Sequence, residues 1–191
     1  MAERIPNLRE VLLLAGIDEI NANGIAGFSI RRVAENCHVS CAAPYRHFKD
    51  KKEFIAAIID YVNDRWAERQ EEILAVCDHN DIRCMIIEIL LGYIDFLMEK
   101  PYYRAILLLK DNDFDNLYHK KRTQFGSLTQ TLEEKLRLRS GLDNETWRRK
   151  AMMCRSLVFG MIFLCDAGDY VYDETTKAYM RYTLNREFEI D

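Results

Sequence analysis

The chain has few of the residues that interrupt helices. Its 191 residues include only 3 Pro and 8 Gly, while hydrophobic residues make up 49% of the sequence. That composition favours long helices joined by short turns around an apolar core. No run of residues alternates as a half-buried strand does, and no internal repeat or low-complexity tract is present. The sequence therefore predicts an all-α protein.

Motifs of catalysis and of metal binding are lacking too. There is no glycine-rich phosphate loop, no serine elbow and no Cys-x-x-Cys pair, and the four histidines are scattered. The spacing of the six cysteines matches no zinc site: Cys37, Cys41, Cys77, Cys84, Cys154 and Cys165. We therefore expect no enzymatic activity, no metal and no cofactor, and we expect reduced thiols.

Signals for secretion and for membrane insertion are missing as well. The N-terminus leads into an amphipathic pattern without the basic and apolar regions of a signal peptide. The most apolar stretch, residues 84–98, contains Glu88 and Asp95 and is too short to span a bilayer. These absences predict a cytoplasmic protein with no membrane contact.

Residues 29–54 carry a helix-turn-helix pattern. Ser29 is placed to cap a short helix, and the apolar residues from Ile30 to Cys37 recur on one face of it. A four-residue joint, Cys37–Ser40, separates this helix from a second one. An aromatic and basic cluster follows the joint, which is typical of a second helix that lies against a nucleic acid.

This second helix is expected to begin near Ser40 or Cys41, with Ser40 as its cap, and to run to about Phe48. Pro44 requires that early start, because a proline costs little in the first turn of a helix and much in its interior. Ala43, Pro44 and Phe48 are expected to pack inward. The second helix is therefore short.

The helix-turn-helix region is basic although the whole chain is acidic. The chain carries a net charge of −4, but residues 29–52 hold six Lys or Arg against two acids, and residues 66–191 hold 18 against 22. A basic patch on an acidic body would orient a protein on a duplex. The alternative is an ordinary solvated face.

Residues 28–34, 39–40 and 42–48, together with Lys51, resemble the DNA-binding domain of the TetR (tetracycline-repressor-like) family. One departure is His38, because the family usually has glycine at that position. If His38 takes a positive φ, the cost is about 1–2 kcal/mol.

The resemblance implies a domain organisation. A three-helix DNA-binding domain occupies residues 1–50, and a larger helical ligand-binding and dimerisation domain occupies residues 51–191. A first helix is expected to start near Asn7. Further helices are predicted over residues 51–77, 82–100, 102–110, 114–138, 147–167 and 173–188, with Ser140–Gly141 as the stop after the helix over 114–138. The polar residues of the helix over 82–100, which are Glu88, Gly92, Asp95 and Glu99, form a narrow stripe that is expected to face solvent.

The resemblance also assigns roles at the DNA. The implied DNA-binding residues are Ser29, Arg31, Ser40, Cys41, Ala42, Ala43, Tyr45, Arg46, His47 and Lys51. Tyr45, His47 and Lys51 align with phosphate-holding positions, although packing is the alternative for Tyr45 and His47. Arg31 and residues 41–43 align with positions that face base edges, and Arg31 is the residue suited to guanine.

By the same resemblance, residues 147–188 form a homodimer interface. A helical stripe contains Ala151, Cys154, Val158, Met161 and Cys165, with Gly160 nearby, and the last helix adds Tyr179, Tyr182, Leu184 and Phe188. Two recognition helices related by a two-fold axis would then read a palindromic operator, with half-sites about 34–36 Å apart. The alternative is that the stripe packs on its own domain.

The middle helices are expected to hold a small apolar or aromatic ligand that releases a repressor from its operator. The predicted ligand-binding residues are Trp66, Tyr93, Phe96, Tyr103, Arg104, Tyr118, His119 and Phe125. Three alternatives stay open. The regulator is ligand-independent, or it responds to thiol oxidation at Cys37 or Cys41, or the chain is a helical enzyme whose helix-turn-helix is incidental.

Overall fold

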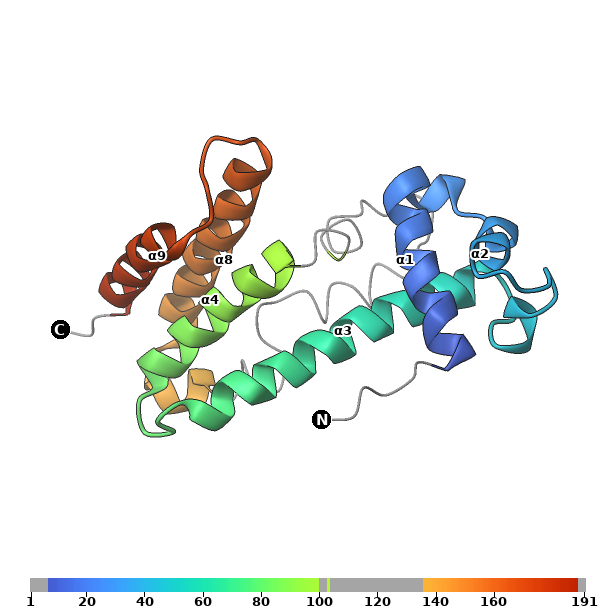
Figure 1. Cartoon of the computed structure of the whole chain (residues 1–191). Coiled ribbons are helices and arrows are strands. Elements are labelled where there is room, and N and C mark those ends of the chain that lie inside the picture. Colours follow the sequence, from blue (N-terminus) through green and yellow to red (C-terminus); the bar gives the residue numbers. More distant parts are fainter. Residues whose placement is uncertain (1–6, 100–102, 104–135, 189–191) are drawn as a thin grey trace. The chain divides into compact units, whose positions relative to one another are not determined.

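The computed structural model describes residues 7–99, 103 and 136–188, and every regular element in those ranges is a helix (Figure 1). The predicted all-α class is confirmed. The chain divides into two compact units. Of the described residues, 7–65 and 103 belong to the first unit, and 66–99 with 136–188 belong to the second.

The first unit contains α1 (Leu8–Gly27), α2 (Ile30–Asn36) and the first part of α3 (Lys51–Val76). Its core residues are Leu12, Leu13, Ile17, Ile20, Val33, Ala34, Phe54, Ile55, Ile58 and Ile59, none more than 2% exposed. Gly16 allows α1 and α3 to approach closely, because a Cβ atom there would lie 2.7 Å from Ile58 Cδ1. The first unit is therefore a tightly packed helical body.

The helix starts of the first unit follow capping rules. The Asn7 side chain accepts a hydrogen bond from the Glu10 N–H at 3.0 Å, as expected for a first helix that starts near Asn7. α3 begins after Asp50, whose carboxylate accepts from the Glu53 N–H at 2.8 Å, while the Glu53 carboxylate accepts from the Lys49 N–H at 3.0 Å. These reciprocal bonds explain the observed start of α3, which agrees with the prediction.

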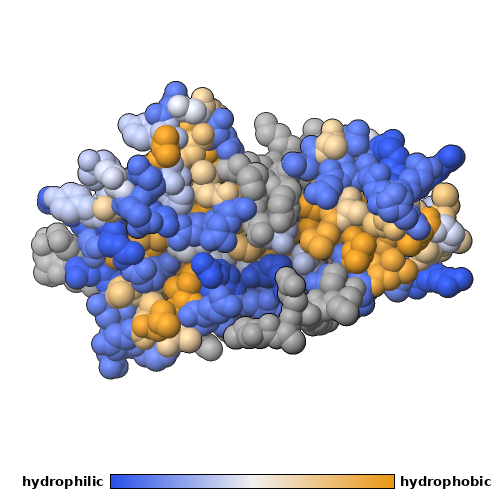
Figure 2. Space-filling model, in the orientation of Figure 1, coloured by the Kyte–Doolittle hydropathy of each residue, from blue (hydrophilic) through white to orange (hydrophobic). Residues whose placement is uncertain are grey.

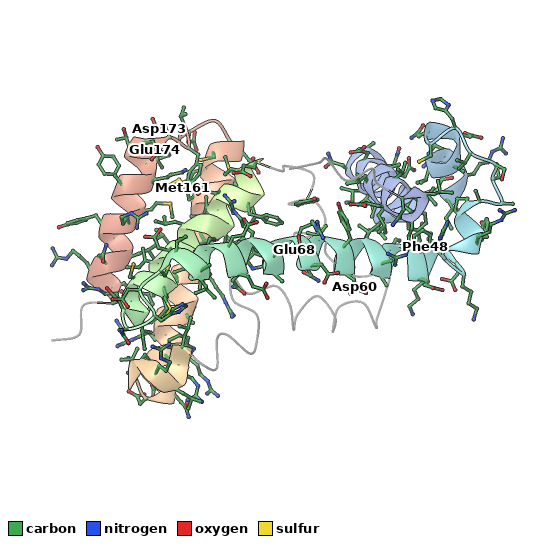
Figure 3. All side chains as sticks on the ribbon, turned by 60° about the horizontal axis from the view of Figure 1, so that its bottom comes forward. Phe48, Asp60, Glu68, Met161, Asp173 and Glu174 are labelled. Carbon is green, nitrogen blue, oxygen red and sulfur yellow. The ribbon has the colours of Figure 1, made fainter. Side chains whose placement is uncertain are left out.

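The second unit is organised around α4 (Ile82–Glu99), on which α8 (Asn144–Asp166) and α9 (Glu174–Glu187) pack. Eleven residues of α4 are buried, in agreement with the nearly all-round apolar pattern of its sequence. Asp143 caps α8, and Asp173, which Figure 3 labels, caps α9. Both carboxylates accept hydrogen bonds of 2.8 to 2.9 Å from backbone N–H groups, and those donors lower the pKa of both carboxyl groups.

The polar stripe of α4 differs from the prediction. Glu99 is exposed as predicted, but Glu88 and Asp95 are half-buried because their carboxylates pair with residues of α9. Asp95 accepts from the Lys177 ammonium and from the Tyr172 hydroxyl, both at 2.9 Å, and Glu88 pairs with Arg181. Gly92 is buried against Ile73 of α3. The partners of Glu88 and Asp95 lie on a helix that is far along the chain, so the spacing of polar residues within α4 could not predict them.

The remaining predictions for the second half are tested only in part. The predicted helix over 102–110 lies outside the described residues apart from Tyr103, and so does the one over 114–138 apart from its end. Residues 136–140 are helical and are followed by Gly141 at φ 71°, the predicted stop. Within the described ranges, no helix has both the length and the apolar character needed to cross a membrane.

Candidate nucleic-acid interface

A buried carboxylate connects α1 to the start of α2. Glu19 is only 4% exposed, and its Oε1 accepts from the Ser29 N–H at 3.1 Å and from Arg32 Nε at 2.9 Å. The Arg32 guanidinium also donates to the Gly27 carbonyl. Because a buried carboxylate needs partners of this kind, these contacts fix where α2 begins. Glu19 was not among the residues predicted from the sequence. The available signal was an acidic residue between the apolar residues Ile17 and Ile20 of the first helix.

Ser29 itself is the predicted cap. Its hydroxyl accepts from the Arg32 N–H at 3.4 Å, while its own N–H is held by Glu19. The residues that follow, Ile30, Val33 and Ala34, are buried as predicted. α2 is thus stabilised by its buried apolar face and by the hydrogen bonds at its first turn.

The joint after α2 is a Schellman motif. The Val39 N–H donates to the Ala34 carbonyl and the His38 N–H donates to the Glu35 carbonyl, both at 3.0 Å. His38 occupies the left-handed position with φ 55°, and among the described residues no other non-glycine residue has a positive φ. The joint therefore has the geometry that usually takes glycine, with histidine in its place.

The recognition segment, residues 40–48, differs from the predicted α-helix. It is a turn followed by a single 3₁₀ turn, Pro44–Arg46, that has no side-chain cap, so Ser40 does not act as the cap. The reason lies in Pro44, which has no N–H to donate to the Ser40 carbonyl. That carbonyl instead accepts from the Ala43 N–H at 2.9 Å, one residue earlier than in an α-helix.

Aromatic packing anchors the far end of the recognition segment. Phe48, which Figure 3 labels, is 2% exposed. Its ring stacks on Phe54 of α3 with centroids 4.0 Å apart. Phe28 meets Phe54 edge to face at 5.4 Å, and the Arg9 guanidinium lies 5.5 Å from the Phe48 centroid. A segment with so little helix is thereby held by its buried side chains.

The predicted DNA-binding residues are brought together on this unit, with different exposure. The exposed ones are Arg31, Ser40, Cys41, Ala42, Tyr45 and Arg46, and the half-buried ones are Ser29, Ala43, His47 and Lys51. Tyr45 is 58% exposed, so it does not serve the core. The His47 ring lies 6.2 Å from that of Phe48, so its half-buried position includes a packing contact.

Two of the basic side chains have partners within the unit. Arg31 Nε pairs with Glu35 at 2.8 Å on the surface of α2. Lys51 Nζ donates to the Ala26 carbonyl at 3.1 Å and lies 6.0 Å from the Phe28 centroid. By contrast, within the described ranges Arg46, Lys49 and Lys52 are exposed and form no ion pair, which leaves their charges available.

The thiols give no metal site in the described part of the chain, where no group of three or more metal-ligating side chains occurs. All six cysteines are free. Burial raises the pKa of the Cys37 thiol, which disfavours its reactive thiolate. Cys41 is exposed, so a thiol response of this segment would depend on Cys41.

The structure brings three predicted ligand-binding residues together in the second unit. The Trp66 ring lies 4.8 Å from that of Tyr93 and 5.5 Å from that of Phe96, and all three are buried. Tyr103 is buried as well, but it belongs to the first unit. Arg104, Tyr118, His119 and Phe125 lie outside the described residues.

The predicted dimer residues differ in burial: Ala151, Gly160, Met161 and Cys165 are half-buried, and Tyr179 and Tyr182 are exposed. Cys154, Val158, Leu184 and Phe188 are buried within their own chain, so the alternative of packing on the same domain is correct for them. The exposed apolar residues of the last two helices and their connection are Met152, Met153, Phe163, Tyr170, Val171, Tyr179 and Tyr182. Apolar residues interrupt the largely hydrophilic face that Figure 2 presents.

Residues 12–58 match the model of the family described as bacterial regulatory proteins, tetR family. The whole chain is similar in fold to a putative tetR family transcription regulator from Shewanella sp. PV-4, with 14% identity, 96% of both chains covered and a TM-score of 0.72. FadR from Bacillus subtilis in complex with stearoyl-CoA has 14% identity, 93% and 96% coverage and a TM-score of 0.74. A TetR variant from Acinetobacter baumannii AYE in complex with minocycline has 16% identity, 96% and 95% coverage and a TM-score of 0.57. No curated protein matches the chain.

Proposed function

We propose that this chain, whose N-terminal domain belongs to the tetR family of bacterial regulatory proteins, is a cytoplasmic homodimeric repressor that a small ligand releases from a palindromic operator. The proposal refines a plainer conclusion, which is that the protein is a TetR-family transcriptional regulator. The observation that carries the proposal is the first unit itself. α2, the Schellman joint and the anchored recognition segment leave Tyr45 and Arg46 exposed beside three further basic residues.

Binding in this proposal depends mainly on the phosphate backbone. Arg46, Lys49 and Lys52 are exposed without ion pairs in the described part of the unit, and Lys51 is close by. Each phosphate that a cationic side chain neutralises makes the slope of log K against log salt more negative by about 0.9. The DNA affinity of a dimer should therefore fall steeply as salt is added. Tyr45 and His47 add hydrogen bonds that position the protein without reading sequence.

Direct base readout in this proposal is sparse. Cys41, Ala42 and Ala43 offer apolar contacts, such as those with thymine methyl groups. Arg31 is the proposed reader of guanine, and it would have to exchange Glu35 for the base. Because that ion pair is exposed on both sides, its loss costs little, and a bidentate guanine contact is worth about 1–3 kcal/mol of discrimination.

Dimerisation through residues 147–188 supplies the second recognition segment. Phe163, Tyr179 and Tyr182 are each more than 60% exposed on α8 and α9, which suits them to a partner subunit. A two-fold axis then requires a palindromic operator with half-sites about 34–36 Å apart or a multiple of that spacing.

Ligand control is proposed for the second unit. Trp66, Tyr93 and Phe96 form an aromatic cluster there, which suits an apolar or aromatic effector. Two similar structures contain organic ligands, stearoyl-CoA in one and minocycline in the other, which supports a small-molecule effector for this chain. Release follows if the ligand binds more tightly to a dimer whose recognition segments no longer fit successive grooves.

Selection of bound sequences from a random duplex pool tests this proposal. At low salt we expect an enriched palindrome, and Arg46→Ala should weaken its binding. Arg83→Ala is the matched control, because Arg83 is exposed on the second unit and forms no ion pair with any residue that the structure describes. Enrichment of no sequence by the unmodified protein would refute DNA binding, and an unsymmetrical site would refute the dimeric arrangement.

A further inference from the structure

One buried hydrogen-bond donor in the second unit has nothing to bond to among the described residues. Trp66 is 5% exposed, and within those residues its indole Nε1–H is buried without an acceptor. Native proteins rarely leave a buried donor unpaired, because such a group has lost its water without gaining a partner. Trp147 is equally buried, yet its indole N–H is not a buried donor without an acceptor. The unpaired donor is therefore a feature of the Trp66 site.

The surroundings of this donor are aromatic. Tyr93 and Phe96, both on α4, lie 4.8 and 5.5 Å from the Trp66 ring in tilted arrangements. Burial raises the pKa of Tyr93, so its phenol stays neutral, while the nearby Arg155 charge acts in the opposite direction. The site thus combines apolar rings with an N–H group that no described residue uses.

We propose that Trp66 determines the specificity of the effector site, because its indole N–H donates to a carbonyl or carboxylate oxygen of a ligand whose aromatic or apolar body packs on Tyr93 and Phe96. This inference rests on the proposed ligand control. An indole N–H can only donate, so the ligand atom that meets it is an acceptor.

A pair of probes of equal shape isolates the hydrogen bond. Acetophenone carries a carbonyl oxygen where α-methylstyrene carries a methylene group, and the two are otherwise alike. In ¹H–¹⁵N spectra of the full-length protein, the two tryptophans give two indole signals, and Trp66→Phe identifies one of them by its loss. Trp147→Phe makes the same assignment from the other signal, so the measurement on the unmodified protein does not depend on whether Trp66→Phe folds.

The expected result is a downfield shift of the Trp66 indole proton with acetophenone and an unchanged Trp147 signal. α-Methylstyrene should bind more weakly by about two- to tenfold, the range for one neutral hydrogen bond. In Trp66→Phe, which keeps an aromatic ring and removes the donor, that preference should disappear. Benzoate separates the two acceptor types: a stronger shift than with acetophenone assigns a carboxylate ligand, and a weaker one assigns a neutral carbonyl.

Three results would overturn the inference. The first is no movement of the Trp66 signal with either probe up to about 1 mM, a dissociation constant typical of ligands of this size. The second is equal binding of the two probes, and the third is a preference that survives Trp66→Phe. The duplex selection is independent of these spectra. An enriched palindrome with a silent Trp66 would reject this inference alone, whereas a failed selection would reject the proposed function.

Discussion

Replacing His38 by glycine should stabilise the first unit. His38 has φ 55° at the left-handed position of the Schellman motif, where the Cβ atom of a non-glycine residue is strained by about 1–2 kcal/mol. His38 is exposed, so the loss of its imidazole uncovers no buried surface. Glycine adds about 0.5–1 kcal/mol of entropy cost on folding. The net gain in the free energy of unfolding should be about 0.5–1 kcal/mol.

Urea unfolding followed by far-ultraviolet circular dichroism measures this gain, because both units are helical. In a thermal melt of a chain of this length, a gain of 1 kcal/mol would raise Tm by about 2–4 °C. His38→Ala is the matched control, since it removes the same imidazole but keeps the Cβ atom. Asparagine, which tolerates this conformation, should fall between alanine and glycine. If glycine were no more stable than alanine, the strain at His38 would be refuted.

Three further predictions concern a buried bond, a helix cap and the DNA contact. Glu19→Ala should lower the free energy of unfolding by at least about 1–3 kcal/mol in urea melts, because the Ser29 N–H loses its acceptor; an unchanged midpoint would contradict this role. Asp173 has a lowered pKa in the fold, so its stabilisation is present above the unfolded pKa of about 3.9 and is lost as pH falls through the folded value. The Tm of Asp173→Asn should therefore vary less between about pH 5 and pH 2 than that of the unmodified protein, and parallel curves would reject the cap. Arg46→Ala should reduce the salt slope of duplex binding by about one per protomer, and a slope equal to that of Arg83→Ala would exclude Arg46 from the phosphates.

Local chemistry explains where prediction from sequence succeeded. The starts of α1, α2 and α3 lie at Asn7, Ser29 and Asp50 because each side chain accepts a hydrogen bond from the first turn that it precedes. Such bonds join residues that are three apart, so the pattern is readable in the chain itself.

The recognition segment is only partly predictable from local rules. Pro44 makes the element short, as predicted, but its missing N–H also prevents the first α-helical hydrogen bond to the Ser40 carbonyl. The outcome is a 3₁₀ turn, which depends on Phe48 and its stacking on Phe54. That stabilising contact joins two elements and could not be derived from the segment alone.

The sequence by itself determined the helical class, the first helix of the helix-turn-helix with the joint that follows it, the basic charge of this region and the starts of α1, α2 and α3, because these depend on neighbours within one or two turns. Only the tertiary structure decided that the polar stripe of α4 holds α9 and that Glu19 holds the start of α2. The tertiary structure was also needed to show that the Trp66 indole N–H has no acceptor among the described residues. The physical reason is common to all three: a buried polar group is defined by its partners, and those partners come from distant parts of the chain or, as we propose for Trp66, from a ligand.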